Sequence, residues 1–281
     1  MLFLGLDLAW GDKNTSGGVV LSLSFQSGSP RIGEGIGGGW GAILDITETL
    51  GNDDEIVAWV RRWDEEAGAE GLLLGVDAPL LVPNVTGKRS CEAEIGRRFA
   101  KFQAGAHPAN RTIFKDNVRG ERLVARLAGH GITDNPYLDT PRRVGVRQMM
   151  EVFPHPAHIV LFNLARTLKY KAKSGRDYQS RWAAMNEYSR LLRGLTAHDP
   201  PLELPGDWPP ADTTGTIAGA LKRLEDGMDA LTCAYIVYWY WWHGREGAEV
   251  LGDLTDGYIV VPRHPEEGKP EQKPKEDNQV Q

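Results

Sequence analysis

Two aspartates in otherwise apolar segments constrain the fold of this chain more than any other feature of its sequence. Residues 1–10 (MLFLGLDLAW) predict a buried strand that contains Asp7, and residues 71–80 (GLLLGVDAPL) predict another with Asp77 near its end. A carboxylate there is unfavourable unless it is paired or binds a metal. Since open α/β sheets bind ligands at the carboxyl ends of their strands, we expect both aspartates to reach one crevice. The alternative is that each carboxylate caps a turn or pairs with an arginine.

The order of hydrophobic patterns predicts an α/β fold, in which three antiparallel strands are followed by parallel strands and helices flank the sheet. The first elements are expected as strands over residues 1–10, 19–25 and, weakly, 31–39, then a helix over 53–67 and the strand over 71–80. Residues 81–147 are expected to form a basic helical and loop insertion over the sheet edge, with helices over 92–102 and 121–129. A strand over 148–153, helices over 157–170, 178–195 and 218–242, and a strand over 257–262 complete the prediction.

The organisation of the chain indicates one domain followed by a tail. Residues 1–262 hold all the predicted elements and form a single predicted domain. Residues 263–281 contain no bulky apolar side chain except Val280, so we expect a disordered tail.

The charge of the chain is unevenly distributed along its length. The net charge is −6, which excludes a wholly basic nucleic-acid-binding protein, but residues 81–193 carry 21 basic and 9 acidic side chains. A cationic middle between acidic flanks suits a protein whose carboxylates hold cations while a separate surface meets a polyanion. Solvated amphipathic helices would explain the same pattern.

Two features bear on the compartment of the protein. Only two cysteines are present, Cys91 and Cys233, which is too few for a disulfide framework. The N-terminus has no signal-peptide pattern, and the most apolar later run, residues 230–242, is too short for a membrane span. We therefore expect a cytoplasmic protein with no membrane partner.

Three further acidic residues are candidates for chemistry. Glu151 begins EVFPHP beside a short predicted strand, and Asp226 and Asp229 lie three residues apart in EDGMDALTCAY on a predicted helix. Like charges at this spacing repel unless a cation or base lies between them. An edge-strand charge for Glu151 and a solvated helix start for Asp226 are the structural alternatives.

The composition of this acidic set selects the metal that we expect. Carboxylates with few histidine or cysteine companions suit hard cations, so the sequence predicts Mg²⁺ or Mn²⁺ rather than zinc. Such ions activate water and stabilise the leaving oxygen when phosphate esters are cleaved. His155 and His158, with Glu151 nearby, are a weaker candidate for a transition-metal site, and a polar helix start explains them equally well.

Basic residues in the middle of the chain are candidates for phosphate contacts. The densest cluster also contains Phe99 and Phe102, which suits base stacking, although a solvated helix face with core aromatics is the alternative. The predicted nucleic-acid-binding residues are Lys88, Arg89, Arg97, Arg98, Lys101, Arg119, Lys171 and Arg176.

Several of these segments, in this order, resemble the DUF429 family of predicted nucleases with a ribonuclease H-like fold. They are GLDLAWG, GVDAPL, KRSCEAEIGRRF, EVFPHPA, a lysine-rich stretch ending at Gly175 and Arg176, EDGMDALTCAY and GYIVVP. The resemblance implies that Asp7, Asp77 and Asp229 hold the metal, with Asp226 three residues before the last of them, as in Holliday-junction resolvases. His155 stands where the family often has an acidic residue or threonine.

Together these observations predict a metal-dependent nuclease or phosphodiesterase. In this hypothesis Asp7, Asp77 and Asp229 bind the ions, Asp226 or Glu151 completes the shell or orients water, and the basic segment binds DNA or RNA. A non-catalytic binding module on the same fold is the main alternative. A phosphotransferase of the actin-like or sugar-kinase type is disfavoured, because only one strand-led phosphate loop is visible. The aromatic run at residues 235–242 indicates a buried helix face or a homodimer contact.

Overall fold

A mixed seven-stranded sheet forms the centre of the computed structural model, which describes residues 1–11, 14–25, 39–115 and 117–263. The strand order is β5-β6-β4-β1-β2-β3-β7. The strands span Leu2–Asp7 (β1), Ser16–Phe25 (β2), Gly39–Leu50 (β3), Gly71–Val76 (β4), Thr133–Asp134 (β5), Val146–Glu151 (β6) and Leu202–Glu203 (β7). Strands β1, β2 and β3 are antiparallel, whereas β4, β6 and β5 continue in parallel from β1. The predicted change from antiparallel to parallel pairing is confirmed.

The third antiparallel strand lies later in the chain than we predicted. It spans Gly39–Leu50, while residues 31–38 of the predicted strand lie outside the described residues. From Trp40 to Leu50 most alternate positions are apolar and most positions between them are polar or glycine, which is the signal that would have located the strand.

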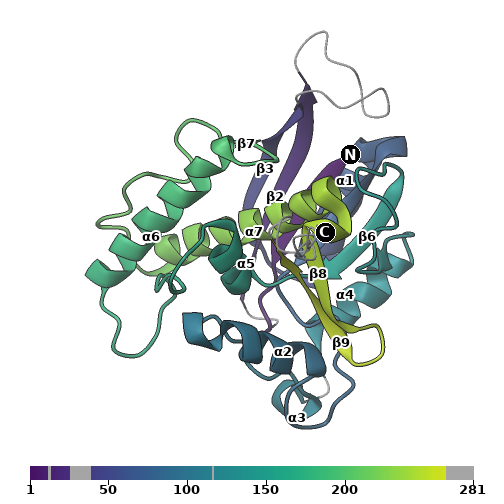
Figure 1. Ribbon diagram of the computed structural model, residues 1–281, viewed down its shortest axis with the longest axis horizontal. Coiled ribbons are helices and arrows are strands. Elements are labelled where there is room, and N and C mark those ends of the chain that lie inside the picture. The colour runs from purple at the N-terminus through teal and green to yellow at the C-terminus, as the bar shows by residue number, and fades with distance from the viewer. Residues whose placement is uncertain (12–13, 26–38, 116, 264–281) are drawn as a thin grey trace, which may run out of the picture.

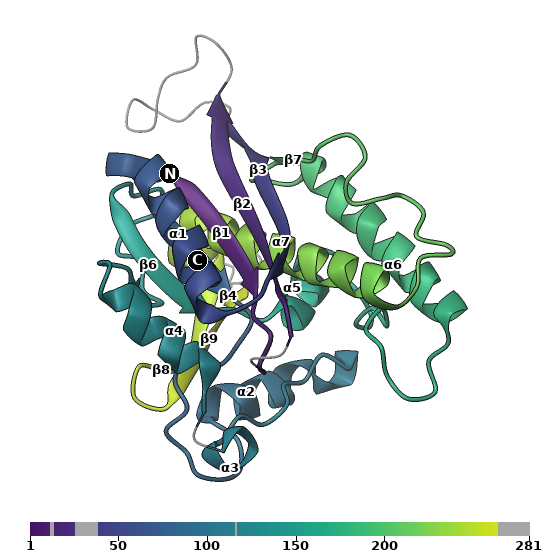
Figure 2. The ribbon, with the colours of Figure 1, turned by 180° about the vertical axis from the view of Figure 1, so that it is seen from behind.

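Helices cover both faces of the sheet (Figures 1 and 2). On one face lies α7 (Ala218–His243), which packs against β1, β2 and β4 and shares its core with Phe3, Val19 and Leu73. On the other face lie α1 (Asp53–Ala67) and α4 (Arg119–Ala128), which pack with the alternate strand residues Leu4 and Leu74. Side-chain alternation along each strand therefore separates two apolar cores.

Two glycines allow α7 to approach the sheet closely. A Cβ atom on Gly5 would lie 1.9 Å from the Ala230 carbonyl oxygen, and one on Gly75 would lie 2.6 Å from the Cys233 carbonyl oxygen. Gly5 and Gly75 are direct partners in the parallel β1–β4 register. The absence of both side chains brings the backbone of α7 against the centre of the sheet.

The remaining elements lie around this core. They are the 3-10 turn η1 (Gly68–Glu70), α2 (Ser90–Phe99), η2 (Ala100–Phe102), α3 (Arg111–Phe114), α5 (Pro154–Leu161), α6 (Tyr178–Arg193), η3 (Gly194–Ala197), η4 (Gly244–Glu246), β8 (Ala248–Asp253) and β9 (Gly257–Pro262). Strands β8 and β9 pair with each other in a second, two-stranded sheet that packs on α2. The segment predicted as an insertion thus contributes β5 to the sheet edge, α4 to one face and α2 to the small sheet.

Two predicted boundaries were wrong. The helix predicted over residues 157–170 begins at Pro154 and ends at Leu161, after which the chain runs without regular structure to α6. The strand predicted over 71–80 ends at Val76, so Asp77 follows the strand. Most of the predicted tail, residues 264–281, lies outside the described residues.

The aromatic run in α7 is buried within the chain. Tyr235, Tyr238 and Trp241 are at most 1% exposed. Phe3 packs against the rings of Tyr238 and Trp241, so this run forms core rather than a surface for a second copy. In the part of the chain that the structure describes, no helix is long and apolar enough to cross a membrane.

Candidate functional site

Asp7 and Asp77 lie side by side at the carboxyl ends of two adjacent parallel strands. Asp7 ends β1, Asp77 directly follows β4, and the Asp77 backbone N–H continues the ladder by donating to the Leu6 carbonyl at 2.9 Å. Both aspartates follow Gly5 and Gly75 by two residues, so alternation places their side chains on the α7 face. This arrangement agrees with the prediction that both reach one crevice.

Helix α7 brings a third carboxylate to Asp7. The Asp226 and Asp7 carboxyl groups are hydrogen-bonded to each other, which requires a proton on one of them. Burial and the neighbouring Asp7 charge raise the pKa of Asp226 to about 8, so Asp226 is the proton donor near neutral pH. Burial, opposed by Lys171 and reinforced by Asp229, also raises the pKa of Asp7. Two acids at this separation need either a shared proton or a cation.

Asp229 lies one turn further along α7 and is fully buried. The hydroxyl groups of Tyr170 and Tyr188 donate to its Oδ1 at 2.6 and 3.2 Å, and Lys171 Nζ lies 2.8 Å from its Oδ2. Burial opposes ionisation of this carboxyl group, but the Lys171 ammonium and the other groups around it together lower the pKa of Asp229. Asp229 is therefore a carboxylate held by two phenols and one cation.

Lys171 supplies the positive charge at the centre of the cluster. Burial disfavours its charged form, but Asp229, Asp7 and Asp77, in that order of influence, raise its pKa well above the ordinary value. Burial raises the pKa of Asp77 well above its usual range, and Lys171 opposes this increase. The ammonium thus stabilises the three aspartates that the sequence selects as metal ligands. Lys222 pairs with Asp226 and Glu225 on the other side of Asp7.

A cavity of about 640 Å³ opens onto this cluster, and we call it the carboxylate cavity. Asp7 and Asp77 line it directly, whereas Asp226 lines a smaller neighbouring cavity together with Asp7. Trp10, 46% exposed, stands at its margin and offers an accessible aromatic ring. The other lining residues are Leu8, Ala9, Gln103, Gly105, His107, Phe153, His155, Thr167, Leu168, Lys169, Lys171, Ala172, Lys173 and Arg176.

The cationic lining of the cavity comes from the segment between α5 and α6. Lys169, Lys171, Lys173 and Arg176 all lie on it, and Arg176 Nη1 donates to the Lys171 carbonyl at 2.6 Å, which fixes the bend of the segment. Four cations therefore line a cavity that also exposes Asp7 and Asp77. The arrangement combines a site for positive charge with a surface for anions.

Glu151, predicted to complete the shell or orient water, does not line the carboxylate cavity; it lines a smaller cavity with Asp77 and Arg89. Its register partner in β4 is Val76, one residue before Asp77, so alternation points Glu151 to the opposite face of the sheet. There Arg89 binds it through two hydrogen bonds of 2.8 and 2.6 Å, and the Leu80 N–H donates to it at 3.0 Å. Although burial raises the pKa of Glu151, Arg89 opposes this increase. Glu151 is a structural ion-pair partner.

The eight predicted nucleic-acid-binding residues have four different surroundings. Lys171 and Arg176 line the carboxylate cavity, as described above. Arg98 and Lys101 line a second cavity beside it. Lys88 is exposed and donates to the Ala106 carbonyl, and Arg97, 69% exposed, pairs with Glu94.

The remaining two of these eight residues are buried, which corrects their predicted role. Arg89, 1% exposed, is held by Glu92 and Glu151. Arg119, 2% exposed, binds Asp53 and the carbonyls of Ala9 and Gly51. Neither guanidinium is accessible to a phosphate group.

Of the two histidines of EVFPHPA, His158 is fully buried and packs against aromatic rings, whereas His155 is half-buried. Burial lowers the pKa of His155 to about 4 and that of His158 to about 3, so both rings are neutral near pH 7. His158 Nε2 lies 2.8 Å from the Tyr188 hydroxyl, and His155 lines the carboxylate cavity. His158 therefore supports the tyrosine that binds Asp229.

The residues of the cluster suit a hard divalent cation in their chemistry. In the described part of the chain, no three histidine, cysteine, aspartate or glutamate side chains lie close enough to form a ready-made metal site. Yet the donors are all carboxylate oxygens, the shared proton of Asp7 and Asp226 takes the place of a cation, and the Lys171 ammonium lies among the other acids. Asp7, Asp77 and Asp229 are the residues that could hold such an ion.

Sequence reasoning missed several residues of the site. Tyr170 and Tyr188 bind Asp229, Lys222 pairs with Asp226, and Trp10 stands at the cavity margin. Trp10 is the last residue of the first predicted strand, and this closeness to Asp7 was an available signal. Tyr170 and Tyr188 are 59 and 41 residues from Asp229 in the sequence, so no local pattern connects them with it.

The fold and the site define an α/β protein with an aspartate cluster at the carboxyl ends of β1 and β4 and a cationic cavity above it. The chain belongs to the DUF429 family, described as "Protein of unknown function (DUF429)", whose sequence profile matches residues 5–252. No curated protein and no solved structure matches the chain.

Proposed function

We propose that this protein hydrolyses phosphodiester bonds in nucleic acid with the help of Mg²⁺ or Mn²⁺. The observation that carries the proposal is the carboxylate cavity, which Asp7 and Asp77 line beside four cationic side chains from one segment. Positively charged side chains are needed to bind a phosphate backbone, and positive charge held next to the scissile phosphate is needed for its hydrolysis. Both requirements are met by residues that line the same cavity.

The sheet supports the ribonuclease H-like arrangement that the resemblance implies. Its central order is β3-β2-β1-β4-β6, with three antiparallel strands followed by two parallel ones. The first acid ends β1, the second follows β4, and the last two lie on the long helix α7. This order of acids along the fold is the one that the resemblance assigns to metal ligands.

Each group has a distinct role in the proposed reaction. Asp7, Asp77 and Asp229 would hold the cation, which supplies activation of water and stabilisation of the leaving oxygen when bound. Tyr170 and Tyr188 orient the Asp229 carboxylate. Lys169, Lys173 and Arg176 bind backbone phosphates, and Trp10 offers a surface for a nucleobase.

A cleavage assay with a matched variant tests the proposal. Wild-type protein is incubated with end-labelled single-stranded DNA, duplex DNA, four-way junction DNA and RNA, with Mn²⁺, with Mg²⁺ or with a chelator. We expect cleavage of at least one substrate that depends on the ion and is abolished in Asp7→Asn. The control is Asp139→Asn, which removes an exposed acid far from the cluster in the sequence and retains activity.

Thermal melting distinguishes an enzyme from a binding module. An ion that binds only the native state raises the melting temperature, so Mn²⁺ is expected to stabilise wild type and Asp139→Asn but not Asp7→Asn. Nucleic-acid binding without cleavage or a metal response would instead support the non-catalytic alternative. Equal cleavage by Asp7→Asn and wild type would overturn the nuclease proposal.

A further inference from the structure

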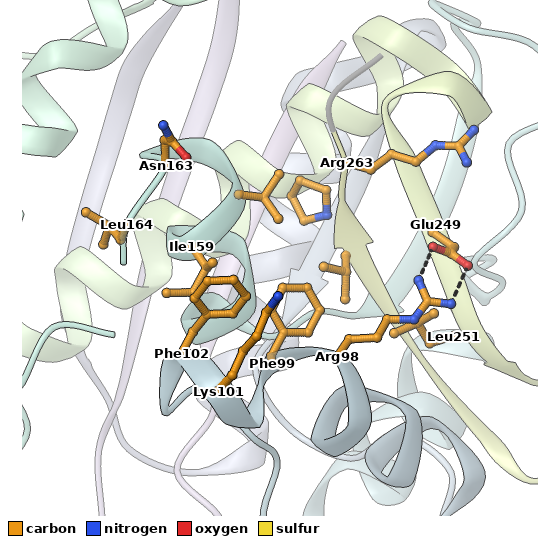
Figure 3. A pocket seen from close by; sticks show the side chains of 13 residues that line it. Arg98, Phe99, Lys101, Phe102, Ile159, Asn163, Leu164, Glu249, Leu251 and Arg263 are labelled. Atoms are coloured by element: carbon orange, nitrogen blue, oxygen red, sulfur yellow. Dashed lines mark hydrogen bonds and ion pairs between the residues drawn. The ribbon is translucent and has the colours of Figure 1, made fainter. Parts of the chain in front are cut away.

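A second cavity, of about 420 Å³, lies beside the carboxylate cavity, and Figure 3 shows the side chains that line it. It is bounded by α2 and η2, by the end of α5, and by β8 and β9. Its lining residues are Arg98, Phe99, Lys101, Phe102, Ile159, Val160, Asn163, Leu164, Glu249, Leu251, Val261, Pro262 and Arg263. The proposed reaction gives this cavity no role.

The second cavity combines positive charge with aromatic surface. Among its lining residues three are basic and one, Glu249, is acidic. Arg98 is held by Glu249 through bonds of 2.5 and 3.0 Å, and Arg263 donates to the neutral backbone carbonyls of Arg245 and Glu246. Such a lining suits a ligand that carries both a phosphate and a planar apolar group.

Lys101 places its charge directly against the aromatic surface. Its ammonium lies 4.8 Å from the centroid of the Phe102 ring, and the Phe99 and Phe102 rings are 6.4 Å apart. Figure 3 shows the Lys101 chain beside the Phe102 ring. A base stacked on the aromatic surface would bring its phosphate within reach of this ammonium.

Three segments contribute neighbouring residues to both cavities. On α5, His155 faces the carboxylate cavity and Ile159 faces the second cavity. At the end of η2, Phe102 lines the second cavity and the next residue, Gln103, lines the carboxylate cavity. Between α5 and α6, Leu164 lines the second cavity and Thr167 lines the carboxylate cavity. The Thr167 N–H donates to the Phe102 carbonyl at 2.8 Å, so a single backbone contact joins the two walls. The cavities are therefore adjacent, and the backbone around Phe102 and Thr167 separates them; we call this backbone the ridge.

We propose that the second cavity binds a nucleotide of the same strand whose scissile phosphate lies in the carboxylate cavity, so that the substrate is a single strand that crosses the ridge. This inference rests on the proposed function. A duplex presents its bases inward and cannot stack them on Phe99 or Phe102, whereas a single strand can. The nucleotide in this cavity is bound through its base and its phosphate, without chemistry.

Binding to strands of different length tests the inference. The binding background is Asp7→Asn, without divalent ions, so that no strand is cleaved during the measurement. Fluorescently labelled trinucleotides, single strands of about 12 nucleotides and a duplex of the same length are titrated by anisotropy. We expect the 12-nucleotide strand to bind about tenfold more tightly than either the trinucleotide or the duplex.

Lys101→Glu in the same background locates the extra affinity. We expect it to reduce the ratio of 12-nucleotide to trinucleotide affinity by about tenfold, because it removes the ammonium beside the stacking surface. Arg61→Glu is the matched control, since it makes the same charge change at a half-exposed position on α1. It is expected to leave the ratio unchanged.

The outcomes separate this inference from the proposed function. If strands bind but Lys101→Glu and Arg61→Glu give the same ratio, the second cavity is not a nucleotide site and the nuclease proposal stands. Preference for the duplex would also overturn the single-strand inference. If no nucleic acid binds at all, the proposed function fails, and this inference fails with it.

Discussion

Asp77 and Glu151 lie at the ends of adjacent parallel strands, yet the structure gives them opposite surroundings. Asp77 faces α7 and an open cavity, where the Lys171 ammonium on an irregular segment opposes the increase of its pKa. Glu151 is the register partner of Val76, the residue before Asp77, so its side chain faces the opposite side of the sheet. There the buried Arg89 guanidinium donates to both of its carboxylate oxygens. A shift of one residue in register therefore separates a candidate catalytic acid from a structural one.

Arg89 and Lys171, the cations beside these two acids, also differ in how accessible their charged groups are. Arg89 is 1% exposed and donates to Glu92, Glu151 and the Leu81 carbonyl, so its guanidinium is fully engaged. Lys171 is 34% exposed, and its compact ammonium lies among several acids rather than in a bidentate pair. A divalent ion or a phosphate can compete for groups around Lys171, whereas two carboxylates and one carbonyl oxygen already bind the Arg89 guanidinium.

Neutralising Glu151 or Asp77 is expected to reveal the largest difference between the two acids. Glu151→Gln leaves Arg89 buried with an incomplete partner and is expected to lower the free energy of unfolding by about 3 kcal/mol. Asp77→Asn relieves repulsion among the acids and is expected to leave stability unchanged or slightly higher. Urea denaturation of both variants checks this, and equal losses would show that Asp77 is also a structural acid.

Lys171→Met is expected to have the next largest effect. It leaves the aspartates without their shared cation and is expected to lower the free energy of unfolding by about 1–3 kcal/mol, less than a fully buried pair because Lys171 is partly exposed. Mn²⁺ is expected to raise the melting temperature of this variant more than that of wild type, since no ammonium competes for the carboxylates. A smaller Mn²⁺ shift in the variant would mean that Lys171 helps to bind the ion.

The pH dependence of stability tests whether Asp226, in the same cluster as Asp77, holds a proton in the folded protein. Its folded pKa of about 8 exceeds the ordinary value of an unfolded aspartate, so the native state binds an extra proton between about pH 4 and 8. Its contribution to stability is therefore greatest at low pH and is lost as the pH rises through 8.

Asp226→Asn removes this contribution and supplies the test. Relative to the variant, metal-free wild type is expected to lose stability by up to about 1.4 kcal/mol per pH unit over this range. Denaturation midpoints measured from pH 5 to 9 with a chelator give the difference. A constant difference between the two proteins would show that Asp226 and Asp7 share no proton.

Trp10→Ala is expected to have the smallest effect on stability and a clear effect on binding. The ring is 46% exposed and packs on Phe114 with centroids 5.2 Å apart, so its loss is expected to change unfolding by less than about 1 kcal/mol. If a base stacks on Trp10, affinity of the Asp7→Asn protein for single strands falls about fivefold or more. Unchanged affinity would exclude Trp10 from the binding surface.

Much of the fold could be predicted because its signals are local. The apolar runs around Asp7 and Asp77, the helical spacing of Ile56, Val60 and Trp63, and the long apolar helix at residues 218–242 are readable within a short window. The helix predicted over 157–170 failed because its apolar and basic residues continue in an irregular segment after Leu161. The small β8–β9 sheet was only half predicted, since β9 (GYIVVP) is almost wholly apolar whereas β8 (AEVLGD) has few apolar residues and is defined by its pairing with β9.

The candidate site was predicted only in part, and the residues show why. Asp7 and Asp77 were readable because a carboxylate in an apolar strand is unusual by itself. The roles of Arg89, Glu151 and Lys171 depend on which charges they meet across 58 or more residues of chain, as the Arg89–Glu151 and Lys171–Asp229 pairs show. No spacing rule links such positions.

By itself, then, the sequence determined the strands that carry Asp7 and Asp77, the helix that carries Asp226 and Asp229, and the concentration of positive charge in the middle of the chain. Only the tertiary structure decided which face each acid occupies and which cation it meets. The physical reason is that burial of apolar residues has a local period along the chain. The partner of a buried charge, in contrast, is set by strand register and by the close approach of α7 over Gly5 and Gly75.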